Sequence, residues 1–154
     1  MANSITGWGV WVMFRSILVP VDGSETAWNA LEYAKTLGEK FAGTITVIHV
    51  VKPVLTISMN GDVPYVPQDI AEIEKIGRSL LAMAQERLTS YPGKVETILE
   101  FGNPAGRILN AIRERQFDSV VIGCRGLSGI TEFFLGSVST AVAQHSPIPI
   151  LIVK

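Results

Sequence analysis

The sequence predicts a doubly wound α/β fold, in which a five-stranded parallel sheet carries helices on both faces. Short apolar, β-branched runs alternate along the chain with longer segments of helical periodicity. The runs are continuous rather than alternating, as in strands that are covered on both faces. We expect a single domain with the strand order 3-2-1-4-5.

The first half of the chain contains two predicted strands around one helix. Residues 16–21 are an apolar run that ends at an Asp22-Gly23-Ser24 turn. Ser24 is suited to cap the next helix, because its hydroxyl can accept from a free backbone N–H. Gly38 predicts the end of that helix. Residues 44–51 are β-branched and predict a central strand.

The middle of the chain contains a long connection, a helix and a third strand. The segment 52–68 carries three prolines and an Asn-Gly pair, and long loops of this kind are often functional. Apolar residues between Ile70 and Leu88 follow helical spacing, and a Pro-Gly pair stops that helix. Residues 95–101 predict the third strand.

The last third repeats the alternation of strand and helix. Asn103-Pro104 predicts a helix start, with a capping side chain followed by proline at the first helical position. Residues 119–122 predict the fourth strand, and a helix begins near Ser137. Residues 148–153 predict the fifth strand, at an edge of the sheet because proline cannot donate to a ladder.

Composition excludes several classes of function. The chain has 154 residues, of which 47% are hydrophobic and 18% charged, with a formal net charge of -1. It has no basic stripe, so no nucleic-acid partner is expected. It has no apolar run of roughly 18–20 residues, so no membrane partner is expected. The single cysteine, Cys124, fits a reducing compartment, which predicts a cytoplasmic protein.

Residues 1–14 are predicted to be an N-terminal extension. They are rich in tryptophan and other apolar residues, but they lack the basic start and cleavage pattern of a signal peptide. Two interpretations are open: a partly ordered tail, or a patch that packs on a partner chain.

Two loops are predicted to border one crevice at the carboxyl end of the sheet. Asp22-Gly23-Ser24 follows the first strand, and Gly123-Cys-Arg-Gly126 follows the fourth. In the expected order these strands are neighbours where the order reverses, which is where open parallel sheets bind ligands. Glycine allows backbone N–H groups to approach an anion, and a helix starting at Ser137 adds free donors. The alternative is that these glycines only form turns.

The order of these motifs resembles that of the universal stress protein family. Residues 17–25 look like the family's opening, and residues 46–50 and 146–153 match it as well. Gly123-x-x-Gly126, followed after nine residues by Gly136-Ser137, looks like its ATP-binding motif. The chain has no P-loop and no dinucleotide fingerprint. The resemblance covers roughly residues 15–154 and implies an adenine nucleotide alpha-hydrolase-like fold in the ATP-binding branch.

The resemblance also implies a set of ligand-binding residues. Val50 and the backbone of Pro20, Val21 and Asp22 would flank the adenine, and Asp22 would help to hold Mg²⁺ or Mn²⁺. The ribose and phosphates would lie along the glycine motif and the following helix start. Ser24 and Ile122 complete the predicted set, and the motif residues are Gly123, Arg125, Gly126, Gly136, Ser137, Val138 and Ser139.

The predicted function is ATP binding by a stress-response sensor or signalling protein. We expect the protein to form a homodimer through residues 148–153 and to have a further protein partner, which the sequence does not identify. No general base stands beside the predicted phosphate site, so at most slow ATP hydrolysis is expected. Two alternatives are open: an adenine-nucleotide-dependent enzyme (adenylyl transferase or ATPase) and a nucleotide-free interaction protein. Asp118 is predicted to be structural and His49 a satisfied core residue. Cys124 is either a small filler or a redox-sensitive thiol.

Overall fold

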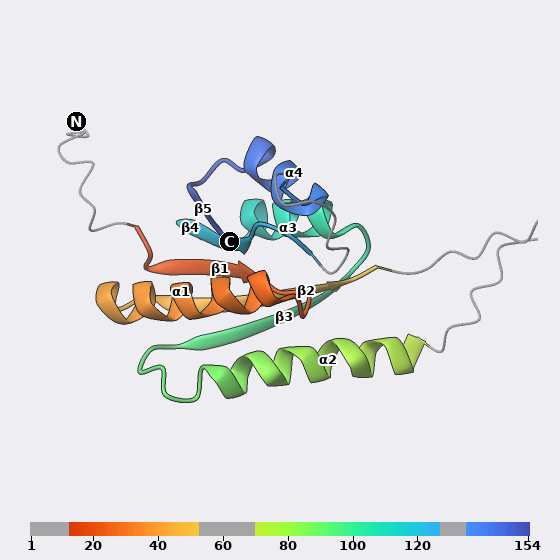
Figure 1. Cartoon of the computed structure of the whole chain (residues 1–154), viewed down its shortest axis with the longest axis horizontal. Helices are drawn as coiled ribbons and strands as arrows, with labels where there is room; N and C mark the ends of the chain where they lie inside the picture. Colours follow the sequence, from red (N-terminus) through yellow and green to blue (C-terminus); the bar gives the residue numbers. More distant parts are fainter. Residues whose placement is uncertain (1–12, 53–69, 127–134) are drawn as a thin grey trace, which may run out of the picture.

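The computed structural model describes residues 13–52, 70–126 and 135–154, and these form one layered α/β unit (Figure 1). The five strands are all parallel and lie in the order β3-β2-β1-β4-β5, which confirms the predicted order. The elements in chain order are β1 Ser16–Pro20, α1 Glu25–Phe41, β2 Thr44–Val51, α2 Ile70–Arg87, β3 Val95–Phe101, α3 Pro104–Glu114, β4 Ser119–Gly123, α4 Ser137–His145 and β5 Ile150–Val153.

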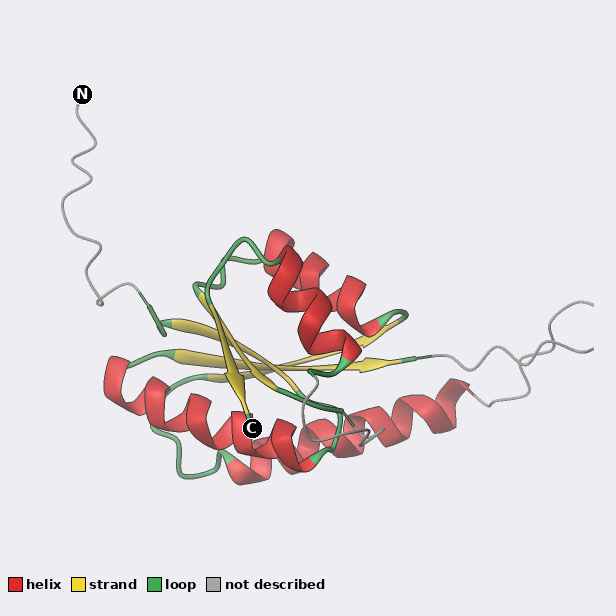
Figure 2. Cartoon of the chain, turned by 45° about the horizontal axis from the view of Figure 1, so that its top comes forward, coloured by secondary structure: helices red, strands yellow, loops and turns green. Residues whose placement is uncertain are grey.

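Helices cover both faces of the sheet, with α1 and α2 on one face and α3 and α4 on the other (Figure 2). Neighbouring residues of β1 point to opposite faces: Ile17 and Val19 pack in the core under α1 and α2, while Leu18 packs under α3 and α4. All three side chains are fully buried. The central strands are therefore covered on both faces, which explains why their sequences are largely apolar without a polar–apolar alternation.

Predicted caps begin two of the helices. The Ser24 hydroxyl accepts from the backbone N–H of Ala27 at 3.3 Å, and the Asn103 side chain accepts from that of Gly106 at 3.0 Å. Each cap satisfies one of the N–H groups that a helix start leaves without an internal partner. Both predicted helix starts are confirmed.

The predicted end of α1 at Gly38 is wrong. The helix continues to Phe41, and Ala42 ends it in the left-handed region with φ 53°. Gly38 is buried inside the helix, where a side-chain Cβ would overlap the Tyr91 ring. The residue is glycine because an aromatic ring packs directly on the helix backbone, and such a contact between distant segments leaves no local signal in the sequence.

Asp118 fastens the beginning of the domain at the amino end of the sheet. Its carboxylate accepts from the backbone N–H groups of Phe14, Arg15 and Ser16 at 2.8–3.0 Å, and from the Ser119 hydroxyl at 2.8 Å. These contacts confirm the structural role that the sequence predicts for Asp118.

The N-terminal extension and the long connection lie largely outside the described residues. Residues 1–12 and 53–69 are not described. Phe14, the last residue of the predicted extension, packs against Phe41 with a ring-centroid distance of 5.6 Å. None of the helices in the described ranges combines the length and the apolar character that crossing a membrane requires.

Candidate functional site

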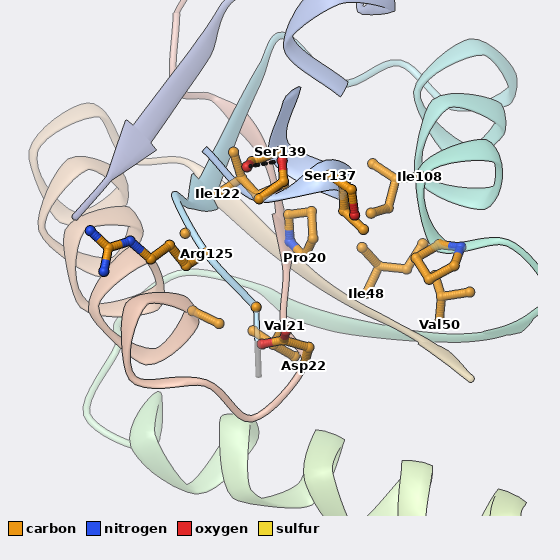
Figure 3. A pocket seen from close by; sticks show the side chains of 16 residues that line it. Pro20, Val21, Asp22, Ile48, Val50, Ile108, Ile122, Arg125, Ser137 and Ser139 are labelled. Atoms are coloured by element: carbon orange, nitrogen blue, oxygen red, sulfur yellow. Dashed lines mark hydrogen bonds between the residues drawn. The ribbon is translucent and has the colours of Figure 1, made fainter. Parts of the chain in front are cut away.

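A cavity of about 240 Å³ opens at the carboxyl end of the sheet, where β1 and β4 lie side by side (Figure 3). The chain leaves β1 toward α1 on one face and β4 toward α4 on the other, so this is the point where the strand order reverses. The residues that line the cavity are Pro20, Val21, Asp22, Ala27, Ile48, Val50, Pro104, Ile108, Ile122, Gly123, Arg125, Gly126, Gly136, Ser137, Val138 and Ser139.

The predicted site residues all line this cavity, with the exception of Ser24. The Ser24 side chain is buried and engaged elsewhere: its hydroxyl caps α1 and donates to the Arg125 carbonyl at 3.3 Å. Ser24 thus joins the loop after β1 to the loop after β4, and it is not among the residues that line the cavity.

Four lining residues were missed by the sequence analysis: Ala27, Ile48, Pro104 and Ile108. Ile48 could have been found, since it lies two residues before Val50 and therefore on the same face of β2. Pro104 and Ile108 belong to α3, and only the three-dimensional packing of α3 beside β2 brings them to the cavity.

The start of α4 differs from the other helix starts around the cavity. The first turns of α1 and α3 are capped by side chains, but the N-cap residue of α4 is Gly136, and no side chain of the described residues caps this helix. The first residues of α4, Ser137 to Ser139, line the cavity. Their backbone N–H groups have no partner inside the helix, and the helix dipole adds positive potential at this end. This helix start is suited to an anion.

The two serines of this turn are not equivalent. Ser139 is buried, and its hydroxyl donates to the carbonyls of Gly136 at 2.9 Å and Cys124 at 3.0 Å (Figure 3). Ser137 is exposed. The hydroxyl hydrogen of Ser139 therefore serves the loop, and Ser137 is the residue of this turn whose hydroxyl can be offered to a ligand.

Arg125 borders the cavity through its backbone. In Figure 3 its guanidinium points away from the side chains that line the interior. The Thr26 hydroxyl donates to the Arg125 carbonyl at 2.7 Å and accepts from its N–H at 3.4 Å. This pair of contacts clamps the loop after β4 onto the first turn of α1, so that the two predicted loops form one wall.

The three positions of the motif are occupied by glycine for different structural reasons. A Cβ on Gly123 would come within 2.7 Å of the Thr26 backbone, so Gly123 lets α1 pack against β4. A Cβ on Gly126 would come within 2.8 Å of Asp22 Oδ2. A Cβ on Gly136 would meet its nearest described neighbours at 3.4 Å, which is ordinary contact. Packing among the described residues therefore explains Gly123 and does not explain Gly136.

Asp22 presents a carboxylate to the cavity. One oxygen, Oδ1, accepts from the Ser24 N–H at 2.9 Å, and the other, Oδ2, lies beside Gly126. Within the described ranges, no group of three or more His, Cys, Asp or Glu side chains is arranged to hold a metal ion. A cation at Asp22 would thus need further oxygen ligands from a bound molecule or water.

Val50 lines the cavity at a level of the sheet where β1 has already ended. The pairing of β1 with β2 stops at Pro20 opposite Ile48, and the last ladder bond runs from the Val21 N–H to the Ile48 carbonyl at 2.9 Å. Val50 is paired with Glu100 of β3 but with no residue of β1. The Val21 carbonyl accepts from Nδ1 of His49 at 2.8 Å. His49 is half-buried rather than in the core, and its Nδ1 is bonded to the loop that carries Asp22.

Cys124 lies behind the cavity. The residue is 6% exposed, and its backbone is fixed by bonds to Val153 and Gly136. Burial of the thiol fits the small-filler interpretation and does not fit that of an exposed redox sensor.

The fold and the cavity together define a doubly wound α/β protein with a cavity at the reversal of strand order, where an apolar wall faces a helix start that no described side chain caps. The family model of the universal stress proteins matches residues 13–154, and the chain belongs to this family. It is 36% identical to the universal stress protein YxiE of Bacillus subtilis, over 92% of this chain and 100% of that protein.

Solved structures with the same fold include several universal stress proteins. One from Burkholderia pseudomallei is 25% identical, with a TM-score of 0.70 over 94% of this chain and 98% of that chain. A universal stress protein in complex with cAMP is 22% identical, with a TM-score of 0.69 over 92% of this chain and 97% of that one. One from Archaeoglobus fulgidus in complex with dAMP is 21% identical, with a TM-score of 0.64 over 90% and 97%. The last two likenesses show the shared fold alone.

Proposed function

We propose that this protein binds an adenine nucleotide, with ATP as the expected ligand, and acts as a nucleotide-dependent stress-response sensor or signalling protein. The observation that carries the proposal is the combination, within one cavity, of an apolar wall and a helix start that no described side chain caps. Nucleotides have the matching division into an apolar base and anionic phosphates. The structural neighbours in complex with cAMP and dAMP support this ligand class.

The apolar end of the cavity suits the base. Ile48, Val50 and Ile108 lie together on one side of the cavity (Figure 3). Beyond the end of the β1 ladder, the peptide groups of Val50 on that side offer one N–H donor and one carbonyl acceptor. Adenine carries an acceptor and an amino donor on one edge, which is the complementary pattern.

The start of α4 suits the phosphates. Ser137 offers a hydroxyl, and the N–H groups of the first turn point out of the helix toward the cavity. Gly126 and Gly136 keep side chains away from this region. A phosphate here would gain both hydrogen bonds and the favourable end of the helix dipole.

Asp22 fits a role in holding Mg²⁺ or Mn²⁺ together with a nucleotide. Mg²⁺ is commonly bound by one or two carboxylates and completed by phosphate oxygens and water. Asp22 supplies one such carboxylate at the cavity wall. When bound, the ion would neutralise phosphate charge next to this residue.

Slow hydrolysis is the most chemistry that we expect. Asp22 and Arg125 are the ionisable residues among the described lining, and the Arg125 guanidinium points away in Figure 3. Rapid phosphoryl transfer requires a positioned nucleophile and charge stabilisation around the transferred group.

We also propose that the protein forms a homodimer through β5 and is located in the cytoplasm.

Calorimetric titration of the purified full chain with ATP, ADP, AMP, cyclic AMP and GTP tests the proposal. We expect saturable binding of adenine nucleotides and weaker binding of GTP. Absence of binding by every adenine nucleotide at millimolar concentration would favour a nucleotide-free interaction protein. Rapid steady-state turnover of ATP would favour an enzyme.

A matched pair of variants locates the phosphates. In Ser137→Glu, an added carboxylate at the first turn of α4 favours the helix by a few tenths of a kcal/mol. The same charge repels phosphate, so we expect affinity for ATP to fall about tenfold or more while adenosine binding stays unchanged. Ser137→Gln has nearly the same shape without the charge and should retain most ATP affinity. Equal ATP binding by Ser137→Glu and wild type would exclude this placement.

A further inference from the structure

We infer that His49 is a positioning residue: by donating from Nδ1 to the Val21 carbonyl, it keeps that carbonyl away from the Val50 N–H and leaves the Val50 peptide groups available to a ligand. The inference concerns the β1–β2 junction at the cavity wall. The expected effect of His49 on nucleotide selectivity rests on the proposed function. The expected effect of His49 on the Val50 N–H does not depend on any ligand.

The register of β1 and β2 identifies the bond that His49 replaces. In a parallel ladder, bonds alternate along each strand, so the bond that follows Val21 N–H to Ile48 C=O would run from Val50 N–H to Val21 C=O. Instead, the Val21 carbonyl is bonded to the imidazole of His49 at 2.8 Å. A carbonyl oxygen requires a donor, so Nδ1 carries a proton in this contact.

Packing fixes the imidazole in this position. His49 lies on the face of β2 that is covered by α2, opposite the face on which Ile48 and Val50 line the cavity. Gly77 of α2 is buried, and a Cβ there would come within 3.3 Å of Cδ2 of the His49 ring and 2.7 Å of Leu99. Helix α2 therefore lies close to one edge of the ring, while the nitrogen on the other edge is bonded to Val21. His49 reaches the ligand wall only through the backbone.

The arrangement has a consequence for specificity. Val50 carries the donor and acceptor that would distinguish adenine from guanine, while the proposed phosphate site is at a different element, α4. If the Val50 N–H were taken up by Val21, recognition of the base would be lost and contacts to the phosphates would persist. His49 thus acts on base selectivity rather than on phosphate binding.

Three variants separate the donor from the ring. His49→Leu and His49→Phe remove the donor; the second keeps an aromatic ring and serves if the first does not fold. His49→Asn keeps an amide N–H at the position of Nδ1, because both nitrogens are bonded to Cγ. Thermal unfolding of each full-length variant records the purely structural cost.

The first measurement needs no ligand. Amide hydrogen exchange of Val50, read by NMR, should slow about tenfold in His49→Leu or His49→Phe, because the Val50 N–H closes onto the freed Val21 carbonyl. His49→Asn should exchange like wild type. Unchanged exchange of the Val50 amide in the folded donor-less variants would overturn the inference.

The second measurement is the ratio of ATP to GTP affinity. Loss of a base contact should lower ATP affinity about tenfold in the donor-less variants and reduce the preference over GTP, with recovery in His49→Asn. Equal ATP preference in wild type and the donor-less variants would also overturn it. Failure of wild type to bind any nucleotide would defeat the proposed function, and the Val50 exchange would still decide the role of His49.

Discussion

An aspartate lies beside a central strand at each end of the sheet, and the two have different hydrogen-bond partners. Asp118 precedes β4 at the amino end, and its carboxylate accepts from three backbone N–H groups and one hydroxyl. Asp22 follows β1 at the carboxyl end and accepts from one backbone N–H of the described residues while facing the cavity. A carboxylate whose acceptor sites are filled by the chain stabilises the fold, and one with unused acceptor capacity is available to a ligand.

Asp118→Ala should produce the largest effect on stability. The substitution leaves three backbone N–H groups at the start of β1 without their charged acceptor, which we expect to cost about 2–4 kcal/mol of unfolding free energy. Urea denaturation measures the loss, and nucleotide affinity of the remaining folded protein should be unchanged. Asp118→Asn keeps one oxygen acceptor and should lose less. A loss of unfolding free energy below about 0.5 kcal/mol in the alanine variant would contradict a stabilising role for the Asp118 carboxylate.

Gly123→Ala and Gly136→Ala should separate packing from ligand contact. The added methyl group at Gly123 meets the α1 backbone, and overpacking of this kind costs about 1–3 kcal/mol. At Gly136, with φ -63° and ψ 158°, alanine fits the backbone and the described neighbours, so the stability change should stay below about 1 kcal/mol. Thermal unfolding compares the two variants. Nucleotide affinity that falls only in the folded Gly136→Ala protein would assign that glycine to the ligand.

Asp22→Ala should have the opposite profile to Asp118→Ala. We expect a loss of about 0.5–1.5 kcal/mol of stability from the single bond to the Ser24 N–H. Nucleotide affinity in the presence of Mg²⁺ should fall about tenfold, because the cavity loses its carboxylate. Calorimetry of Asp22→Ala and Asp22→Asn, with and without Mg²⁺, checks this. Affinity that is unchanged in both variants would remove Asp22 from the site.

Gly126→Val would change two features of the cavity at once. Replacing Gly126 with valine would add a Cβ within 2.8 Å of Asp22 Oδ2. The substitution would therefore displace the Asp22 carboxylate as well as fill the space near the phosphates. Its effect on affinity cannot be assigned to one of the two causes, which is why Ser137→Glu is the sharper test.

Tyr91→Phe should produce a small effect on stability, and its pH dependence tests the burial of the Tyr91 hydroxyl. The Tyr91 hydroxyl donates to the Gly43 carbonyl at 2.5 Å, and its loss should cost about 1 kcal/mol near pH 7. Burial, with a smaller contribution from the negative charge of Glu39, raises the pKa of Tyr91 above its ordinary value of 10.0.

The sign of the pH effect follows from proton binding. The folded protein holds the phenol proton more tightly than the unfolded chain, so this contribution to stability is complete below pH 10 and declines as the pH rises above it. The difference in stability between wild type and Tyr91→Phe should therefore shrink above pH 10. Urea denaturation at pH 8 and at pH 10.5–11 measures it, and a difference that is constant over that range would contradict the buried position.

The sequence predicts the layout of the fold closely because the information is local. The residue ranges predicted for the second and third strands, 44–51 and 95–101, agree with β2 and β3, since their β-branched runs are bounded by turn residues. Both side-chain caps are encoded within three residues of the helix start. The error at Gly38 arises from a tertiary contact, because Tyr91 lies on another element.

The residues of the candidate site also fall into two groups: those that local sequence predicts and those that depend on tertiary packing. The glycine motif and Asp22 could be found from the sequence because they are loop residues at strand ends. The contributions of Pro104 and Ile108 depend on where α3 packs, and the engaged hydroxyl of Ser139 depends on the path of the Cys124 carbonyl. The link between His49 and Val50 depends on the register of two strands, which residue types alone do not specify.

The clamp between Thr26 and Arg125 has a consequence for biosynthesis. Its two residues are separated by 99 positions, and β4, the neighbour of β1, begins only at Ser119. At about 5–20 residues per second, a ribosome needs roughly 5–20 s to travel from one residue to the other. During that interval the emerging β1 has an open edge on the side of β4, and the ligand cavity has one wall. Ligand binding is therefore expected to begin only after the C-terminal third has emerged. A ligand would not stabilise the partly synthesised chain before that point.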